Sequence, residues 1–151
     1  MKKIFCADGF MVDRDVVLGK ISSIQRCLKR IRDVTRLDPD SLDNLDIQEI
    51  VILNLQRAIQ GSIDLAAHVV ADEGLGVPQE LRENFDLLLK NGVIPADLSG
   101  RLRKMVGFRN IAVHEYETID IEIMKSILQH NLIDIEQFYV YIVRHYNLSE
   151  E

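Results

Sequence analysis

The sequence is poor in the residues that mark several classes of protein. It has no tryptophan, three prolines and two cysteines in 151 residues. The two cysteines, Cys6 and Cys27, cannot build a disulfide framework or a multi-cysteine zinc site, and no group of cysteines and histidines has the spacing of metal ligands. We therefore expect a protein of a reducing compartment, the cytoplasm, with no structural metal and no cofactor.

Long apolar runs are also missing. The uncharged apolar stretches are far shorter than the roughly 20 residues that a membrane-spanning helix needs, and the first twelve residues lack the apolar run of about 7–15 residues found in a signal peptide. Apolar residues nevertheless make up 47% of the chain and charged residues 28%. This composition is typical of one compact domain, here residues 1–151, and we expect it neither to cross a membrane nor to be exported.

Basic residues are outnumbered by acidic ones, 18 to 24, which gives a net charge of −6. This balance counts against a protein that binds nucleic acid over its whole surface. The charge is unevenly distributed, because positions 101–110 hold four cations and no acid. The four are Arg101, Arg103, Lys104 and Arg109. The chain therefore has one basic segment in an otherwise acidic sequence.

Apolar residues recur at steps of three and four through most of the chain, and the alternation typical of strands is nearly absent. This pattern predicts an all-α fold, an up-and-down bundle of the four-helix type with one additional short helix. The four longer helices are expected at residues 13–34, 46–72, 96–112 and 120–146. The short one is expected to start at Pro78 and to stop at Asn91-Gly92.

The helix expected at residues 96–112 has an arginine in a core position. Its apolar stripe, Leu98, Leu102 and Met105, continues at the same spacing to Arg109. Arginine is almost never fully buried unless it is paired, so this position requires an anion, a carboxylate partner or a second subunit. On residue type alone, an internal salt bridge and a functional anion site are equally compatible with the pattern.

A histidine follows this arginine at a distance of five residues. At about 100° per residue, Arg109 and His114 diverge by roughly 140° on a regular helix, so one helix cannot direct both at the same atom. Two solutions remain open. Either the helix ends near Ala112 and the chain turns His114 back, or the arginine and histidine that act together belong to two copies around a two-fold axis.

The segment Arg109-Asn110-x3-His114-x-Tyr116 resembles the R-x4-H-x-Y signature of the HEPN superfamily, in its HepT-like toxin branch. The resemblance extends beyond the motif. Residues 55–88 and 98–120 resemble the second helix, the short helix and the motif helix of that branch in order, so the similarity covers most of residues 14–140. Residues 1–12 do not resemble a usual start of the branch and are interpreted as an extension or an altered start site.

The resemblance implies a homodimeric, metal-independent endoribonuclease toxin of a toxin–antitoxin pair. Its RNA site would lie in a cleft where two copies of the motif face each other. The resemblance also implies a partner, a small MNT-type nucleotidyltransferase that neutralises the toxin by transferring AMP from ATP to the motif tyrosine, Tyr116.

The residues of the motif suit this chemistry. Cleavage of RNA without a metal uses the 2′-hydroxyl as nucleophile, and it requires a proton acceptor that titrates near neutrality and a fixed cation for the charge that develops on the phosphate. His114 suits the first role. Arg109 suits the second, because its planar guanidinium matches phosphate oxygens. Asn110 is expected to orient the substrate or His114, and the hydroxyl of Tyr116 to line the same cleft.

Five further polar residues have two interpretations each. Asp64 and His68 form an i, i+4 pair, which is either an exposed pair that supports its helix or a group near the cleft, where the carboxylate would hold the motif arginine or orient the motif histidine. Arg101, Arg103 and Lys104 are either a solvated helix face or cations that guide an RNA backbone inward.

Two alternatives to an active nuclease remain open. The first is a helical nucleotide-binding partner of a nucleotidyltransferase, which would use Arg109 and Tyr116 only to hold phosphate. The second is an inactive paralogue whose motif packs a dimer. The complete set of motif residues favours the enzyme, because packing alone does not need a titratable histidine close to a cation.

Overall fold

The computed structural model describes residues 7–148, and the side chains of residues 14–148. Within this part the chain is all-helical and has no strand, as the sequence predicts. Its elements are α1 (Ala7–Thr35), η2 (Pro39–Asp43), α2 (Leu45–Glu73), α3 (Glu83–Lys90), α4 (Ala96–His114), η3 (Tyr116–Thr118), α5 (Ile121–His130) and α6 (Leu132–His145). Residues 1–6 of the expected extension lie outside the described residues, and α1 begins at Ala7 rather than at Asp13.

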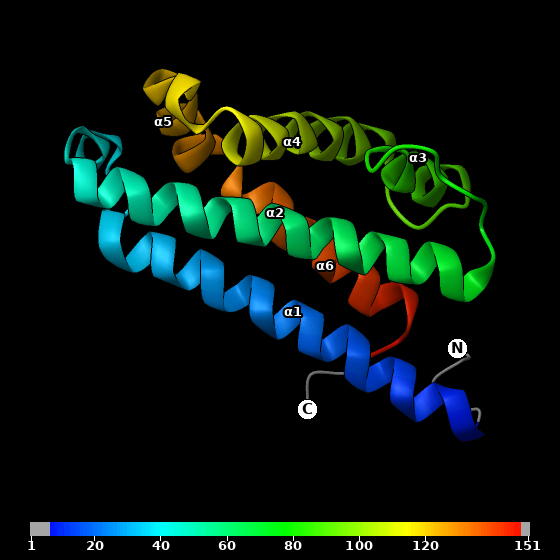
Figure 1. Cartoon of the computed structure of the whole chain (residues 1–151). Helices are drawn as coiled ribbons and strands as arrows, with labels where there is room; N and C mark the ends of the chain where they lie inside the picture. The colour runs from blue at the N-terminus through cyan, green and yellow to red at the C-terminus, as the bar shows by residue number, and fades with distance from the viewer. Residues whose placement is uncertain (1–6, 149–151) are drawn as a thin grey trace.

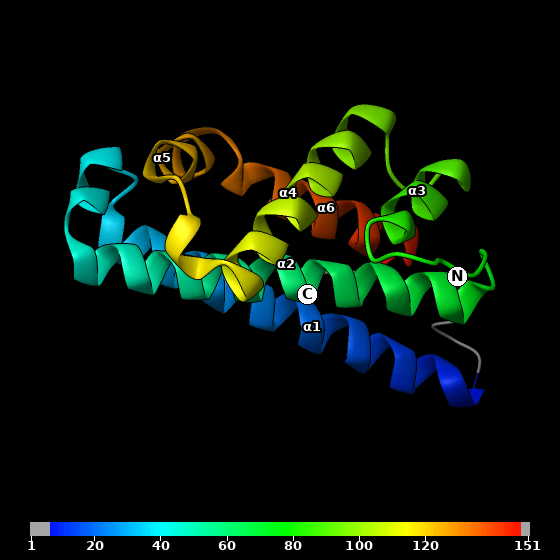
Figure 2. The same ribbon diagram turned by 45° about the horizontal axis from the view of Figure 1, so that its top comes forward.

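The helices α1 and α2 form a long antiparallel pair, and the remaining helices lie on one side of it (Figure 1). Helices α4 and α6 pack against α2 and against each other. Helix α3 packs on α2 and α4 near one end of the bundle, whereas α5 lies next to η2 at the other end (Figure 2). Helix α2 is therefore the central element on which the motif helix α4 rests. None of the helices in residues 7–148 has the length and apolar character needed to span a bilayer.

The apolar stripes read from the sequence form the core. The stripe of α1, from Val17 to Ile31, is at most 5% exposed, and that of α2, from Ile52 to Val70, is at most 4% exposed. The two helices approach closely at Gly61, where a Cβ atom would lie 2.8 Å from Cγ1 of Ile24. These two stripes form one part of the core, which residues of α3, α4, α5 and α6 complete.

The prediction of one helix over residues 120–146 is wrong, because the chain forms two helices separated at Asn131. Asn131 has φ −119° and ψ −6°, outside the regular helical range. Its backbone N–H still donates to the carbonyl of Ile127 (2.9 Å), and its side-chain amide donates to Oδ2 of Asp134 (2.9 Å) at the start of α6. The expected cap at Asp120 is confirmed, since its carboxylate accepts from the N–H of Glu122.

The predicted start of the short helix at Pro78 is also wrong. The segment after Pro78 forms turns with backbone bonds between residues three apart, and α3 begins only at Glu83. Oε1 of Glu83 accepts from the backbone N–H of Gln79 (2.6 Å). The N–H of Gln79 is thus bonded to a side-chain carboxylate, as in a turn, and not to a backbone carbonyl, as in a helix. The predicted end of α2 is confirmed, because Gly74 caps it in the left-handed conformation (φ 63°).

Candidate functional site

The motif lies at the C-terminal end of α4. The helix is continuous as far as His114, and the backbone N–H of Glu115 donates to the carbonyl of Ile111 at its end (2.7 Å). The solution in which the helix ends near Ala112 and the chain turns His114 back is therefore wrong. In one copy of the chain, the side chains of Arg109 and His114 leave α4 in directions roughly 140° apart.

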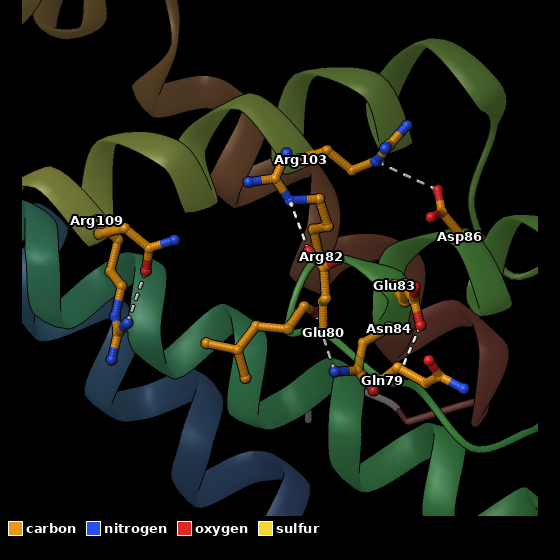
Figure 3. Close-up of polar contacts among 10 residues, drawn as sticks. Gln79, Glu80, Arg82, Glu83, Asn84, Asp86, Arg103 and Arg109 are labelled. Atoms are coloured by element: carbon orange, nitrogen blue, oxygen red, sulfur yellow. Dashed lines mark hydrogen bonds and ion pairs between the residues drawn. The ribbon is translucent and has the colours of Figure 1, made fainter.

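Arg109 extends from α4 toward α2, as Figure 3 shows. Its Nη1 donates to Oδ1 of Asn110 at 2.8 Å. Its Nε is buried and has no hydrogen-bond partner, and none of the ion pairs among the side chains of residues 14–148 includes it. Within the described part of the chain, the internal salt bridge that the sequence left open is not formed. Arg109 is thus a cation with an unmet donor at a packed contact between helices.

The other motif residues surround the end of α4. Asn110 contacts Arg109 through its Oδ1 and so restrains the guanidinium. His114 is exposed at the last helical position, and Tyr116, in η3, is 45% exposed. The structure therefore brings Arg109 and Asn110 into contact on the motif helix. The side chains of His114 and Tyr116 are open to solvent.

Asp64 is exposed on α2, where its Oδ1 accepts from Nε2 of Gln60 (2.9 Å). No ion pair joins Asp64 to Arg109 or His114 among the described side chains. The hydrogen bond of Gln60 leaves its own Oε1 buried and without a partner. In residues 14–148, no group of three or more His, Cys, Asp or Glu side chains is arranged to hold a metal ion.

The remaining cations of the basic segment differ in their surroundings. Nε of Arg101 donates to Oδ1 of Asp134 at 2.8 Å, and this hydrogen bond to a carboxylate that is 5% exposed raises the pKa of Arg101. Arg103 lies 3.4 Å from Asp86 (Figure 3), whereas Lys104 is exposed. Arg101 therefore joins α4 to α6, and Lys104 is the cation of the three that has no ion pair within residues 14–148.

Sequence reasoning missed a groove of about 600 Å³ next to the motif, between α4, η3 and α5. Its apolar lining includes Met105, Phe108, Ile111, Ile119, Ile123 and Ile127. The groove depends on η3 and on the separate orientation of α5, and neither follows from apolar spacing.

The sequence matches the Ribonuclease HepT-like family over residues 24–142. It is 44% identical over 124 residues to the mRNA nuclease HepT of Shewanella oneidensis, a match that covers 82% of this chain and 93% of that protein.

Two solved structures have the same fold. A toxin–antitoxin with AMP-PNP contains a chain with a TM-score of 0.82 and 42% identity, over 86% of this chain and 98% of that one. The tri-AMPylated HEPN toxin of Shewanella oneidensis, in complex with an MNT antitoxin, has a TM-score of 0.81 and 43% identity over the same shares. On its sequence and on its fold, the chain belongs to the HepT-like ribonuclease family of the HEPN superfamily.

Proposed function

We propose that this chain is an endoribonuclease toxin that cleaves RNA between two copies of α4. The observation that carries this proposal is the buried, unpartnered Nε of Arg109. A buried donor without a partner costs about 1–3 kcal/mol, and an oxygen of a bound phosphate would remove that cost. The identity to the mRNA nuclease of Shewanella oneidensis supports RNA as the substrate.

The proposed site uses residues of both copies. Because α4 is regular to His114, one copy cannot direct Arg109 and His114 at the same phosphate, whereas two helices related by a two-fold axis can. Ile111 of α4 and Ile123 of α5, which both line the groove next to the motif, are 42% and 52% exposed. These apolar side chains support a surface that a second copy covers.

The proposed reaction needs no metal. His114 takes the proton of the 2′-hydroxyl, the 2′-oxygen attacks the adjacent phosphorus, and the bond to the 5′-oxygen breaks. The products are a 2′,3′-cyclic phosphate and a 5′-hydroxyl, whose proton comes from water. Arg109 binds the phosphate oxygens as negative charge develops, and Asn110 restrains its guanidinium. Lys104 would attract the RNA backbone, because it is exposed and has no ion pair within residues 14–148.

The proposed partner is an MNT-type nucleotidyltransferase, and the proposed compartment is the cytoplasm. The complex of the tri-AMPylated Shewanella toxin with an MNT antitoxin supports this choice of partner. Its acceptor on this chain would be the exposed Tyr116. AMP phosphates attached there would occupy the anion position next to Arg109 and repel an RNA backbone. Inhibition would therefore require no unfolding.

Cleavage of single-stranded RNA by the unmodified protein in the presence of EDTA tests the nuclease. His114→Ala should slow cleavage by about 10²–10⁴-fold, since a proton acceptor is removed. His130→Ala, which changes an exposed histidine at the end of α5, is the matched control and should cleave at the parent rate. Mass spectrometry of the fragments should show 2′,3′-cyclic phosphate ends. If the parent cleaves no RNA, or His114→Ala cleaves equally fast, the alternative of a nucleotide-binding partner is favoured.

A further inference from the structure

A second groove lies between α1 and α2. It has a volume of about 610 Å³, and its lining includes Arg26 and Arg30 of α1 and Arg57 of α2. No acidic residue lines it. Figure 1 shows that α1 and α2 run side by side at this seam, and the close approach at Gly61 forms part of the groove. We call this site the α1–α2 groove. Its lining residues are Ser23, Ile24, Arg26, Cys27, Arg30, Ile50, Leu53, Asn54, Arg57 and Gly61.

The charge of this groove is unusual for the molecule, because acidic residues outnumber basic ones in the chain, 24 to 18. A groove between α4 and α6 shows the ordinary pattern, since Arg101 and Arg144 share it with Asp97 and Glu136. In the α1–α2 groove, by contrast, cations accumulate without acids. Like charges repel one another, so gathering three cations in one groove does not itself stabilise the fold.

The three guanidinium groups are not neutralised by neighbours. Arg26 donates to the hydroxyl oxygens of Ser22 (3.1 Å) and Ser23 (3.0 Å), which carry no charge. Arg30 and Arg57 take part in no ion pair among the side chains of residues 14–148. Exposed guanidinium groups with no carboxylate are available to an anion from solution.

The spacing of the cations favours an extended anion. Arg26 and Arg30 are four residues apart, about 6 Å along the axis of α1, and Arg57 faces them from α2. The groove is therefore cationic on both walls, while Ile50 and Leu53 give it an apolar portion. Planar bases pack on apolar groups and on guanidinium planes, whereas a free phosphate ion makes no favourable contact with apolar side chains.

We propose that the α1–α2 groove binds the phosphodiester backbone of single-stranded RNA, outside the Arg109 and His114 site. The inference rests on the proposed function, in which RNA is the substrate. Its three arginines would contact phosphates, and contacts to phosphates do not distinguish one base from another. The same helix α2 carries Arg57 and packs against the motif helix α4.

The binding test uses the His114→Ala protein, so that the RNA is not cut. Arg26→Gln, Arg30→Gln and Arg57→Gln together should weaken binding of a labelled single-stranded oligoribonucleotide by about 10–100-fold at low salt, measured by fluorescence anisotropy. The slope of log K against log salt should shrink by about 2, since each lost phosphate contact contributes roughly 0.7. Thermal melting should show that this triple variant remains folded.

The matched control removes three cations elsewhere, by Arg82→Gln, Lys90→Gln and Arg144→Gln, and changes the net charge equally. Lys90 and Arg144 are exposed, whereas Arg82 is partly buried and lies 3.9 Å from Glu80. It should bind within about threefold of the parent and keep the parent's salt slope. Equal affinities and slopes for the two triple variants would overturn the inference.

Cys27 provides a second measurement, because its thiol lies in the groove. Burial raises the pKa of Cys27, and the charges of Arg57 and Arg26 partly oppose that rise. With Cys6→Ser, Cys27 is the one thiol left in the sequence. Bound RNA should slow alkylation of Cys27 at about pH 8, and an unchanged rate at saturating RNA would contradict the proposal.

Cleavage by the parent separates the two hypotheses. If RNA protects Cys27 but the parent cuts no RNA, the proposed nuclease function is wrong and RNA binding in the α1–α2 groove is retained. If the parent cuts RNA and Cys27 is not protected, only the proposal of RNA binding in the α1–α2 groove is contradicted.

Discussion

At the scale of single residues, Tyr116 is available for chemistry by another enzyme, since its side chain is 45% exposed in η3. Tyr116→Phe removes the acceptor oxygen and keeps the ring, so the variant should stay folded. Co-expressed with an active partner nucleotidyltransferase, the parent should gain AMP-sized additions in intact-mass spectra and the variant none. Tyr141→Phe, on α6, is the control and should be modified as the parent is.

The same experiment has a growth readout. A toxin that cannot be modified should keep inhibiting growth in the presence of its partner. If parent and Tyr116→Phe both stay unmodified beside a demonstrably active partner, the regulatory part of the proposed function fails while the nuclease part can stand.

Arg101 shows what the sequence context of a single residue leaves open. The neighbours of Arg101 in the chain suggest a cation in a basic segment. Its partner Asp134 is 33 residues away, on a helix whose orientation depends on the break at Asn131. No spacing rule reaches across such a break, so this salt bridge could not be predicted. By contrast, the unusual position of Arg109 was predictable from the stripe of a single helix.

At the scale of elements, Gly61 fixes how closely α1 and α2 approach. In Gly61→Ala the new methyl would meet Cγ1 of Ile24, a buried and stiff side chain, so we expect the free energy of unfolding to fall by about 1–3 kcal/mol. The gain in helix propensity, about 1 kcal/mol, offsets only part of this. Chemical denaturation measures the change.

Gly100 of α4 is the matched control, because nothing lies within 4 Å of the position that its Cβ would take. Gly100→Ala should therefore raise the free energy of unfolding by about 0.5–1 kcal/mol through propensity alone. Equal shifts in the two variants would show that the packing at Gly61 does not limit the helix pair.

The elements themselves were predictable to different degrees. The stripes of α1, α2 and α4 follow from spacing, because each of these helices buries one continuous face. The break at Asn131 was not predicted, since the apolar residues of α5 and α6 keep a helical spacing across it. The α1–α2 groove was missed for a different reason: its cations come from two helices, and their pairing across the seam depends on helix rotation.

At the scale of the whole molecule, the proposed dimer can be tested by mixing two inactive proteins. Arg109→Ala and His114→Ala each remove one half of the proposed site. If the arginine and histidine of each site come from different copies, a mixed dimer keeps one complete site. Co-expression with random pairing should then restore about a quarter of the parent cleavage rate, because half of the dimers are mixed and each has one active site of two.

Sites built within one copy would give no such recovery, since every mixed dimer would then hold two damaged sites. Light scattering of the parent gives an independent check. A monomer at micromolar concentration would contradict the shared site even if cleavage were observed.

In the proposed function, the unmet donor of Arg109 means that selection for activity acts against stability at this position. Replacing the guanidinium by an apolar side chain of similar length, such as methionine, would remove the buried unpaired nitrogen and the proposed catalytic cation together. Loss of the proposed activity by this route would remove one cost to stability, the unmet donor, although the hydrogen bond to Asn110 would also be lost. Under the proposed function, a population of cells with an unrestrained toxin would then escape through one substitution that leaves the bundle folded.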